Sequence, residues 1–505
     1  MNVRHLVQRR NYYAFVAIKY VLDCINRFVA LFERSRKGEL PAITDPLLLE
    51  SAVSLCAKIK KFEITCEDVI RAYIKRIEQV QPVINAVIDT RFNEAIEEAK
   101  QFDNVLRNGS SQEKNALLDK PLLGLPFTCK DSISVKGCNF TAGLMSRKGI
   151  KAEEDAPVVT LMREAGAIPL AVTNVPEFLL FWNSENPLYG RTKNPYDLSR
   201  IPGGSSGGEA ALIASAGSVL GIGSDIGGSL RIPPHCCGEY ATMGPIARYA
   251  RDLPSILKVI TNNSPKLKLN EEVDLKRIKI YYTDENIGNP LVTPVSDEIK
   301  QTMKKAIDYL STRYGIVAER IRLRELIYSM GIFSAAIKLK DPRTLAESVT
   351  NGNGTINPVH ELLKYMFGRS NHTLGIILAS LMENMSFSKP ESDFGKYCLQ
   401  MSESLKEKFR QILDDGVFFY PTLPEVAIKH RTIYLKSFDA HYTTVFNILE
   451  LPSTHCTFGL SKDGLPLGFQ MITLPFNDRL TLALAIEFEK TFGGWTPPCS
   501  IHLPQ

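Results

Sequence analysis

The chain has 505 residues, of which 44% are hydrophobic and 23% are charged, and its formal net charge is +5. This composition is ordinary for a globular protein with a large core, and the dispersed basic residues argue against nucleic-acid binding. The ten cysteines show no repeated Cys-x-x-Cys pairs, which excludes an obvious zinc site or disulfide framework and favours a reducing, intracellular compartment. We expect no metal and no cofactor.

Residues 1–40 differ from the rest of the chain. Residues 12–32 are rich in apolar side chains but are interrupted by Lys19, Asp23 and Arg27. Such charges inside a membrane-spanning helix would cost several kcal/mol. The apolar residues recur instead at helical spacing: Phe15, Ile18, Leu22, Ile25, Val29 and Phe32. The pattern favours an amphipathic helix that lies on a membrane, and the alternative is a helix that docks on the body of the protein.

The next part of the chain, up to about residue 104, has helical periodicity. We expect helices over residues 48–60, 66–79 and 90–103, with Thr65 and Thr90 as N-caps. A short strand fits residues 84–88. Residues 108–120 are polar and are predicted to form a loop.

Residues 123–131 read Leu-Gly-Leu-Pro-Phe-Thr-Cys-Lys-Asp, a turn followed by a short apolar strand that ends at Lys130. Lysine is rarely buried completely unless it has a partner. Taken alone, this segment would be interpreted as a strand that ends in a surface lysine.

Strand and helix patterns alternate after this point. We expect helices over residues 156–165 and 209–215, and strands over residues 167–172 and 218–222. A loop over residues 174–177 follows the first of these strands. This alternation is typical of an α/β architecture.

The second half of the chain continues the mixture. Helices are predicted over residues 249–260, 293–314, 438–449 and 481–491, and strands over residues 277–282, 417–421 and 467–472. Residues 321–384 have no clear pattern. Their apolar run at 374–382 is open to three interpretations: core, part of an acyl-chain channel, or a membrane-facing patch. No linker divides the body, so we expect one domain over residues 45–505.

Two glycine–serine loops carry the chemical signal. Residues 203–208 read Gly-Gly-Ser-Ser-Gly-Gly, and residues 223–229 read Gly-Ser-Asp-Ile-Gly-Gly-Ser. Glycine at this density is costly in regular structure, so it indicates strained backbone or N–H groups exposed to a ligand. Serine hydroxyls among such N–H groups are the setting of a nucleophile beside an oxyanion hole.

The first loop also matches two other motifs in part. Residues 203–207 satisfy Gly-x-Ser-x-Gly, the nucleophile elbow of α/β-hydrolases, which would make Ser205 the nucleophile. That fold needs a downstream histidine, and the candidates His430, His441 and His455 lie in no supporting motif. A phosphate-binding loop is excluded because no Gly-Lys-Ser/Thr follows the glycines.

Together with residues 230–233, Leu-Arg-Ile-Pro, the two loops resemble the signature block of the amidase signature family. Further similarity at residues 46–49, 189–198, 464–468 and 489–495 extends the resemblance over nearly the whole chain from residue 46. It implies an α/β fold with a large mixed central sheet covered by helices on both faces. It also implies hydrolysis of an amide, and similarity to members that cleave fatty-acid amides implies a lipophilic acyl chain.

The resemblance implies a Ser-Ser-Lys triad in which Ser229 is the nucleophile, Ser205 the bridging serine and Lys130 the base. Lysine at its ordinary pKa of about 10.4 is charged at pH 7, and burial must lower that pKa before it can act as a base. Ser206 is expected to support the triad, and Asp225 and Arg231 to hold the nucleophile loop without taking part in the chemistry. The implied oxyanion hole consists of the backbone N–H groups of Ile226, Gly227, Gly228 and Ser229.

The sequence departs from the family pattern directly after these loops. Relatives have a Gly-x-x-x-Lys-Pro-Ser/Thr-x-Gly-type block before a Gly-Pro pair, whereas here residues 236–242 run straight into Met243-Gly244-Pro245. Comparison with the family pattern therefore predicts that a piece long enough for a strand and its turns is missing near residues 238–243. Two functions follow: an active serine amidase, or a catalytically impaired homologue acting as a membrane-associated or binding protein. A homodimer stays an open alternative to a monomer.

Overall fold

The computed structural model describes residues 20, 24, 40–242, 244–285, 288–384 and 389–504. The amphipathic helix predicted within residues 1–40 lies almost entirely outside these ranges. Within them, the structure contains no helix that combines the length and the apolar character needed to cross a membrane.

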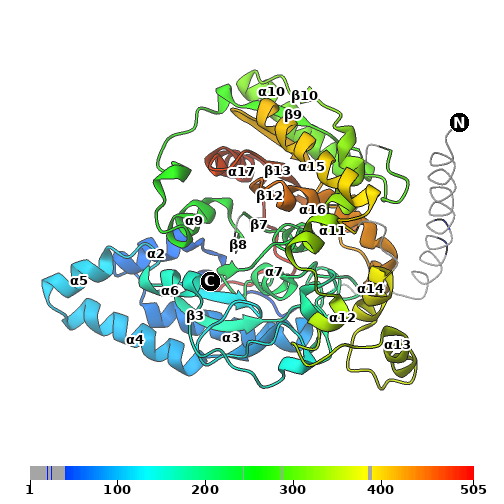
Figure 1. Ribbon diagram of the computed structural model, residues 1–505. Helices are drawn as coiled ribbons and strands as arrows, with labels where there is room; N and C mark the ends of the chain where they lie inside the picture. The colour runs from blue at the N-terminus through cyan, green and yellow to red at the C-terminus, as the bar shows by residue number, and fades with distance from the viewer. Residues whose placement is uncertain are drawn as a thin grey trace, which may run out of the picture.

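An eleven-stranded mixed sheet forms the centre of the described chain, in the order β1-β3-β2-β6-β8-β7-β12-β13-β11-β9-β10 (Figure 1). Its strands are β1 (Val87–Thr90), β2 (Pro126–Lys130), β3 (Ile168–Thr173), β6 (Leu220–Ile222), β7 (Tyr240–Ala241), β8 (Pro245–Ala247), β9 (Lys279–Tyr282), β10 (Glu319–Arg320), β11 (Gly416–Tyr420), β12 (Ser453–Leu460) and β13 (Pro466–Ile472). A separate hairpin pairs β4 (Glu185–Asn186) with β5 (Gly190–Arg191). The predicted α/β class with a mixed central sheet is confirmed.

The α-helices surround this sheet. They are α2 (Ala52–Lys60), α3 (Cys66–Ile84), α4 (Phe92–Asn108), α5 (Ser111–Leu118), α6 (Pro157–Glu164), α7 (Gly207–Ala214), α8 (Ile232–Cys237), α9 (Leu253–Ile260), α10 (Asp297–Tyr314), α11 (Ser329–Lys340), α12 (Leu345–Ser348), α13 (Pro358–Met366), α14 (Leu374–Asn384), α15 (Asp393–Ile412), α16 (His441–Ile448) and α17 (Asp478–Phe492). The 3₁₀ helices are η1 (Pro46–Leu49), η2 (Met145–Arg147), η3 (Glu177–Leu179), η4 (Ala250–Asp252), η5 (Pro265–Leu267), η6 (Leu275–Arg277), η7 (Arg324–Tyr328) and η8 (His430–Ala440).

Neighbouring residues of β13 show that helices cover both faces of the sheet. Phe469 packs against Phe488 of α17, with ring centroids 6.4 Å apart. The next residue, Gln470, donates its side-chain N–H to the carbonyl of Tyr442 in α16 at 2.7 Å. Because successive side chains of a strand point to opposite faces, α17 and α16 lie on opposite sides of the sheet.

Three parallel strands create the edge that carries the glycine–serine loops. β2 pairs in parallel with β3 on one side and with β6 on the other, so the carboxyl ends of all three lie at one edge. β2 ends at Lys130, β3 ends at Thr173, and β6 ends at Ile222, directly before the second loop. In open α/β sheets, ligands bind outside the carboxyl ends of the strands, so the fold itself points to this edge.

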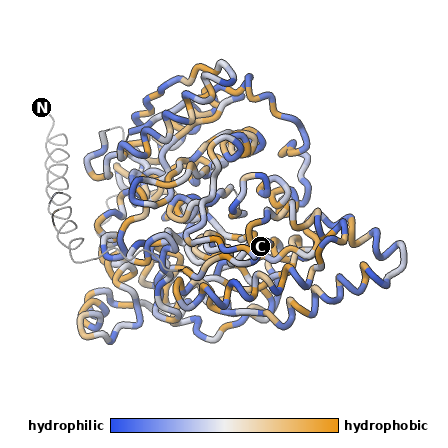
Figure 2. The backbone as a smooth tube through the Cα atoms, turned by 180° about the vertical axis from the view of Figure 1, so that it is seen from behind, coloured by the Kyte–Doolittle hydropathy of each residue, from blue (hydrophilic) through white to orange (hydrophobic). Residues whose placement is uncertain are grey.

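Most elements of the first half of the chain were predicted, but three details were wrong. Thr90 does not cap a helix: it ends β1, and α4 follows Arg91, whose side chain makes no cap hydrogen bond. The strand expected over residues 84–88 lies at 87–90, because α3 continues through Ile84. The third error is a missed helix. Residues 108–120 were expected to form a loop, but residues 111–118 form α5. Ser110 accepts a hydrogen bond from the Glu113 N–H, and the Glu113 side chain accepts one from the Ser110 N–H. This capping box overrides the polar composition of the segment. The α4–α5 pair extends away from the body, and hydrophilic and hydrophobic stretches alternate along it (Figure 2).

A tight hairpin occupies the place where the sequence predicts a missing piece. β7 and β8 pair antiparallel and are separated by residues 242–244 alone. Glu239, directly before β7, is fully buried, and neither carboxyl oxygen has a hydrogen bond of ordinary geometry to another described residue. Burial raises the pKa of Glu239 well above its ordinary value, although the backbone N–H groups of Glu239 and Ala214 and the charge of Arg248 oppose this shift. The hairpin therefore places an acidic side chain in the core that forms no ion pair with a described residue.

We predict that Glu239→Gln stabilises the protein, and increasingly so as the pH rises. The folded protein holds a proton on Glu239 that the unfolded chain releases above its ordinary pKa of 4.5. The free energy of unfolding therefore falls as the pH rises, by about 1.4 kcal/mol per pH unit until the carboxyl ionises in the folded state. Calorimetric unfolding at pH 5 and pH 8 should show a larger gain in Tm for the variant at pH 8. Glu63→Gln, at an exposed position, is the matched control and should have no such pH dependence.

Candidate active site

Lys130 lies at the carboxyl end of β2 and is 1% exposed. Its Nζ atom is 2.7 Å from the hydroxyl oxygen of Ser205. It is also 3.1 Å from both the carbonyl oxygen and the hydroxyl oxygen of Ser224. Burial lowers the pKa of Lys130 to about 7, against the attraction of Asp225 and Glu209, which raises it. A substantial fraction of Lys130 is therefore neutral at pH 7, as a general base requires.

The first loop places Ser205 next to Lys130. Both Ser205 and Ser206 are buried, and α7 begins immediately after them. The Ser206 hydroxyl makes no hydrogen bond to Lys130 or to any other residue that the structure describes. A Cβ atom on Gly223 would lie 2.7 Å from the Ser206 hydroxyl, so Ser206 packs against the start of the second loop. Its supporting role stays a prediction.

The second loop carries Ser229, which is only partly buried. The Ser229 hydroxyl makes no hydrogen bond to any described residue, Ser205 included. The backbone N–H of Gly228 donates to Asp225 Oδ1 at 2.5 Å. Within the described chain, the N–H groups of Ile226, Gly227 and Ser229 have no such partner, which leaves them available to a ligand.

The backbone of this loop requires glycine at one position. Gly228 has a φ of +121°, a conformation that residues with a side chain rarely adopt. A Cβ atom there would also lie 2.4 Å from the Thr443 hydroxyl oxygen. The glycine therefore allows both the turn and the close approach of α16 to the loop.

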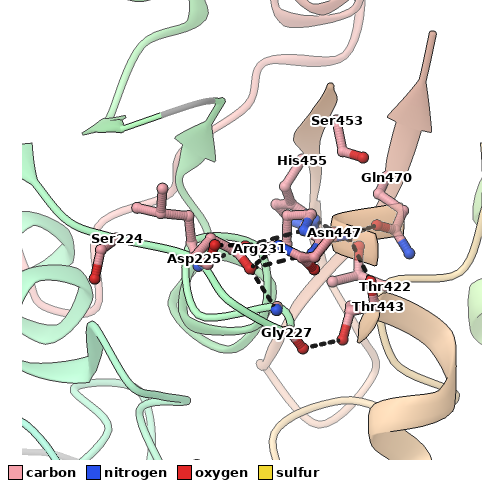
Figure 3. A network of polar contacts seen from close by, with 12 residues as sticks. Ser224, Asp225, Gly227, Arg231, Thr422, Thr443, Asn447, Ser453, His455 and Gln470 are labelled. Carbon is pink, nitrogen blue, oxygen red and sulfur yellow. Dashed lines mark hydrogen bonds and ion pairs between the residues drawn. The ribbon is translucent and has the colours of Figure 1, made fainter. Parts of the chain in front are cut away.

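A buried ion pair holds the loop from within (Figure 3). Asp225 accepts hydrogen bonds from Arg231 Nε at 3.1 Å and Nη2 at 3.2 Å, and from the Leu230 N–H at 2.9 Å. Burial alone would raise the pKa of Asp225, but the charge and hydrogen bonds of Arg231 outweigh it and lower the pKa to about 2. The carboxylate is therefore ionised, and its role in this geometry is to close the loop.

The same pair ties the loop to α16 and β13. Arg231 Nη1 donates to the Thr443 carbonyl at 3.1 Å and to Gln470 Oε1 at 2.9 Å. The Thr443 hydroxyl donates to the Gly227 carbonyl at 2.7 Å, and the Asn447 side-chain N–H donates to Asp225 Oδ1 at 2.8 Å. Sequence reasoning missed Thr443 and Asn447, although their i, i+4 spacing in a predicted helix puts both on one face.

The three histidines considered for a nucleophile elbow do not take part in the hydrogen bonds around Ser205 and Ser229. The Ser205 hydroxyl contacts Lys130, and none of the three histidines makes a hydrogen bond to Ser205 or Ser229. His455 Nδ1 lies 2.9 Å from the Thr422 hydroxyl. The ring nitrogens of His430 and His441 have no partner within the described residues. This geometry supports a lysine rather than a histidine as the base.

The chain is similar to known amidases over most of its length. A family model described as Amidase matches residues 68–241 and 239–482. Fatty-acid amide hydrolase 2-A of Danio rerio is 38% identical, with 95% of this chain and 96% of that protein covered. Fatty-acid amide hydrolase 2 of Homo sapiens is 39% identical, with 90% and 91% covered. The two matched segments of the family model overlap at residues 239–241, where the sequence predicts the missing piece.

Solved structures show the same fold. A 6-aminohexanoate cyclic dimer hydrolase aligns with a TM-score of 0.70 at 20% identity, over 88% of this chain and 97% of that one. A fatty acid amide hydrolase aligns with a TM-score of 0.66 at 19% identity, over 90% of this chain and 86% of that one. At this identity the likeness concerns the fold alone.

We predict that Arg231→Met lowers the free energy of unfolding by about 3–5 kcal/mol, because it leaves Asp225 buried without its cation. Equilibrium unfolding in urea measures the loss. Arg71→Met is the control, since Arg71 pairs with Glu67 at the surface and should cost less than about 1 kcal/mol. Equal losses in the two variants would contradict a structural role for the Asp225–Arg231 pair.

Proposed function

Since the chain belongs to the amidase signature family, we propose that it is a serine amidase that hydrolyses a fatty-acid amide through an acyl-enzyme. The observation that carries this proposal is the contact between the buried amine of Lys130 and the hydroxyl of Ser205. A lysine with a pKa near 7 can accept a proton that a serine hydroxyl gives up. The second serine, Ser229, stands on a loop with unpartnered N–H groups beside it.

In the proposed first step, neutral Lys130 takes the proton of Ser205, and Ser205 takes the proton of Ser229. The Ser229 oxygen attacks the amide carbonyl carbon, and the carbonyl oxygen becomes an oxyanion. The N–H groups of Ile226, Gly227 and Ser229 are placed to stabilise that oxyanion, and losing one such donor typically costs about 3 kcal/mol. Gly228, whose N–H is bonded to Asp225, would join them only by releasing that bond.

The proton then returns along the same path. Lys130 gives it back through Ser205 to the leaving nitrogen, the C–N bond breaks, and an amine departs. An ester between Ser229 and the acyl group remains. Water, deprotonated by the same relay, attacks this ester. The bond between the acyl carbon and the Ser229 oxygen breaks, the relay returns its proton to that oxygen, and the carboxylic acid is released. The relay requires the Ser229 hydroxyl to turn toward Ser205 when substrate binds, because catalytic hydrogen bonds often form only in the complex.

A lipophilic acyl chain fits the surroundings of the site. The segment at Phe181 lies against Gly204, since a Cβ on Gly204 would be 2.8 Å from the Phe181 carbonyl oxygen. The Phe181 ring contacts Gly375 of α14 and stacks edge-on against Tyr434, with centroids 5.5 Å apart. This links the apolar run at residues 374–382 to the first loop. The two relatives named above, fatty-acid amide hydrolases, support the same substrate class.

A second candidate is a catalytically impaired homologue that acts as a membrane-associated or binding protein. Three observations favour it. The family match divides into two segments at residues 239–241, Glu239 is buried and forms no ion pair with a described residue, and the Ser229 hydroxyl has no hydrogen bond to a described residue. Misplacement of a reacting group by about 1 Å can cost roughly 100-fold in rate.

The first test is labelling with a fluorophosphonate, which modifies an activated serine. We expect the purified full chain to gain one adduct by intact mass, and Ser229→Ala to gain none. Lys130→Met should label roughly 10²- to 10⁴-fold more slowly, because the base is lost. Ser311→Ala, at an exposed position on α10, should label like the wild type.

The other outcomes of the labelling experiment would point to a different nucleophile or to an inactive protein. Labelling that persists in Ser229→Ala but disappears in Ser205→Ala would move the nucleophile to Ser205. A folded wild type that is never labelled would favour the impaired homologue. Release of oleate from oleamide, compared with release of acetate from acetamide, would then test the preference for a long acyl chain.

We also propose that the protein is intracellular and associates with membranes through its N-terminal segment. The amphipathic pattern of residues 12–32 supports this, as does the end of α13, where Met366 and Phe367 are 71% and 76% exposed. Wild type should sediment with phosphatidylcholine–phosphatidylserine vesicles, and Leu22→Asp with Ile25→Asp should not. Met366→Ser with Phe367→Ser should reduce sedimentation less. Val317→Ser, at a highly exposed valine elsewhere, is the control.

A further inference from the structure

A buried carboxyl group that the relay does not use lies beside Lys130. Glu209 belongs to α7 and has no exposed surface. The hydroxyl of Thr128 donates to its Oε2 atom at 2.6 Å. The hydroxyl of Thr173 donates to its Oε1 atom at 2.7 Å. Each oxygen of this acid therefore accepts a hydrogen bond from a different strand.

The two threonines are the neighbours of Lys130 in the sheet. Thr128 precedes Lys130 by two residues on β2, so both side chains emerge from the same face of the strand. Thr173 is the register partner of Lys130 in the parallel pairing of β2 with β3. Glu209 thus joins both strands on the face from which Lys130 projects.

The third strand of this edge leaves room for the carboxyl. A Cβ atom on Gly221 of β6 would lie 2.2 Å from Glu209 Oε2, so any other residue there would displace the acid. β6 pairs with β2 through Gly221 and Thr128. The carboxyl therefore rests on three adjacent strands at the edge where the two glycine–serine loops begin.

Lys130 is the basic side chain whose charge acts on Glu209. From β2 it faces Lys130, whereas the thiol of Cys129 points to the other face of the strand. From the second loop Asp225, already paired with Arg231, faces Lys130. Arg76 of α3 and Arg248 next to β8 do not pair with Glu209, because they donate hydrogen bonds to backbone carbonyls just after the end of α7. No basic side chain hydrogen-bonds to Glu209 in the described part of the chain. Burial raises the pKa of Glu209 above its ordinary value, whereas the hydrogen bonds from its two threonines and the charge of Lys130 lower it, so the carboxyl and the amine titrate as a coupled pair.

We propose that Glu209 is a positioning residue for Lys130: its carboxyl braces the ends of β2 and β3, and its ionisation is coupled to that of Lys130, which sets the pH range in which Lys130 acts as a base. This inference rests on the proposed function, in which Lys130 takes the proton of Ser205. Because the two groups are coupled, their protons come off in two steps that belong to the pair. Removing the carboxylate leaves Lys130 to titrate alone, at a lower pH.

The test is the pH dependence of the second-order rate of fluorophosphonate labelling, measured on the full chain. Labelling should rise with pH as Lys130 loses its proton. In Glu209→Gln, which keeps the shape of the side chain, we expect the midpoint of this rise to move to lower pH by about one unit or more. Thr128→Val and Thr173→Val should move it in the same direction by less, because they make Glu209 harder to ionise.

These threonine variants also keep the test valid if Glu209→Gln does not fold. Thr302→Val, at a buried threonine of α10 whose hydroxyl bonds a backbone carbonyl, is the matched control and should leave the midpoint in place. An unchanged midpoint in Glu209→Gln, with only a lower plateau, would overturn the charge role and reduce Glu209 to a brace. So would unchanged midpoints in both threonine variants.

Failure of the proposed function gives a different result. If Lys130→Met labels at the wild-type rate and with the wild-type pH dependence, Lys130 is not the base, and this inference falls with it. If labelling depends on Lys130 but the pH midpoint of labelling is unchanged in Glu209→Gln, the proposed function stands and only the role of Glu209 is wrong.

Discussion

The cost of removing the Lys130 ammonium from water is the constraint on which the rest of the site depends. An isolated buried charge is so unfavourable that the group releases its proton or recruits partners. The fold does both. It places two hydroxyl groups and a carbonyl within hydrogen-bonding distance of Nζ, and it surrounds the amine with buried carboxyl groups that partly offset the loss of solvent. The result is a lysine whose pKa is lowered to about 7, and a lowered pKa is what a lysine needs to act as a general base at neutral pH.

The site also requires its two loops to lie very close to neighbouring backbone, and glycine makes this possible because it has no side chain. Ser205 reaches the lysine only because its loop packs directly on neighbouring backbone, and the carboxyl of Glu209 fits over β6 only because residue 221 has no side chain. The density of glycine in the two loops is thus a consequence of three-layer packing at one edge of the sheet. Each added methyl group there would push apart groups that must touch.

Local patterns predicted much of this from the sequence, and long-range contacts account for what was missed. The β2 and β3 strands, the helix after the first loop and the proximity of Lys130 to Ser205 follow from short apolar runs and from the family resemblance. Ser224 was not predicted as a lysine partner, because nothing in a linear motif shows which hydroxyl turns inward. Thr443 and Asn447 lie more than 200 residues from the loop they hold, so only the folded chain brings them together. The α5 helix was missed for a local reason, since its capping box was not recognised in a polar segment.

The position of these long-range contacts bears on the piece that the sequence predicts to be missing after the second loop. The nucleophile loop is fixed through Arg231, Thr443 and Asn447 to α16 and to β13, and β13 lies beyond β7 and β12 in the strand order. Against the β7–β8 hairpin, the Gly223 N–H donates a hydrogen bond to the Gly244 carbonyl at 2.9 Å, and Leu230, directly after Ser229, belongs to the same buried apolar cluster as Ala241 and Ile246. A deletion in this part of the sheet would therefore act on both ends of the loop, on its start through Gly223 and beside Ser229 through Leu230. The ion pair of Arg231 with Asp225 and the bonds of Arg231 to α16 and β13 are the anchors that do not pass through this hairpin.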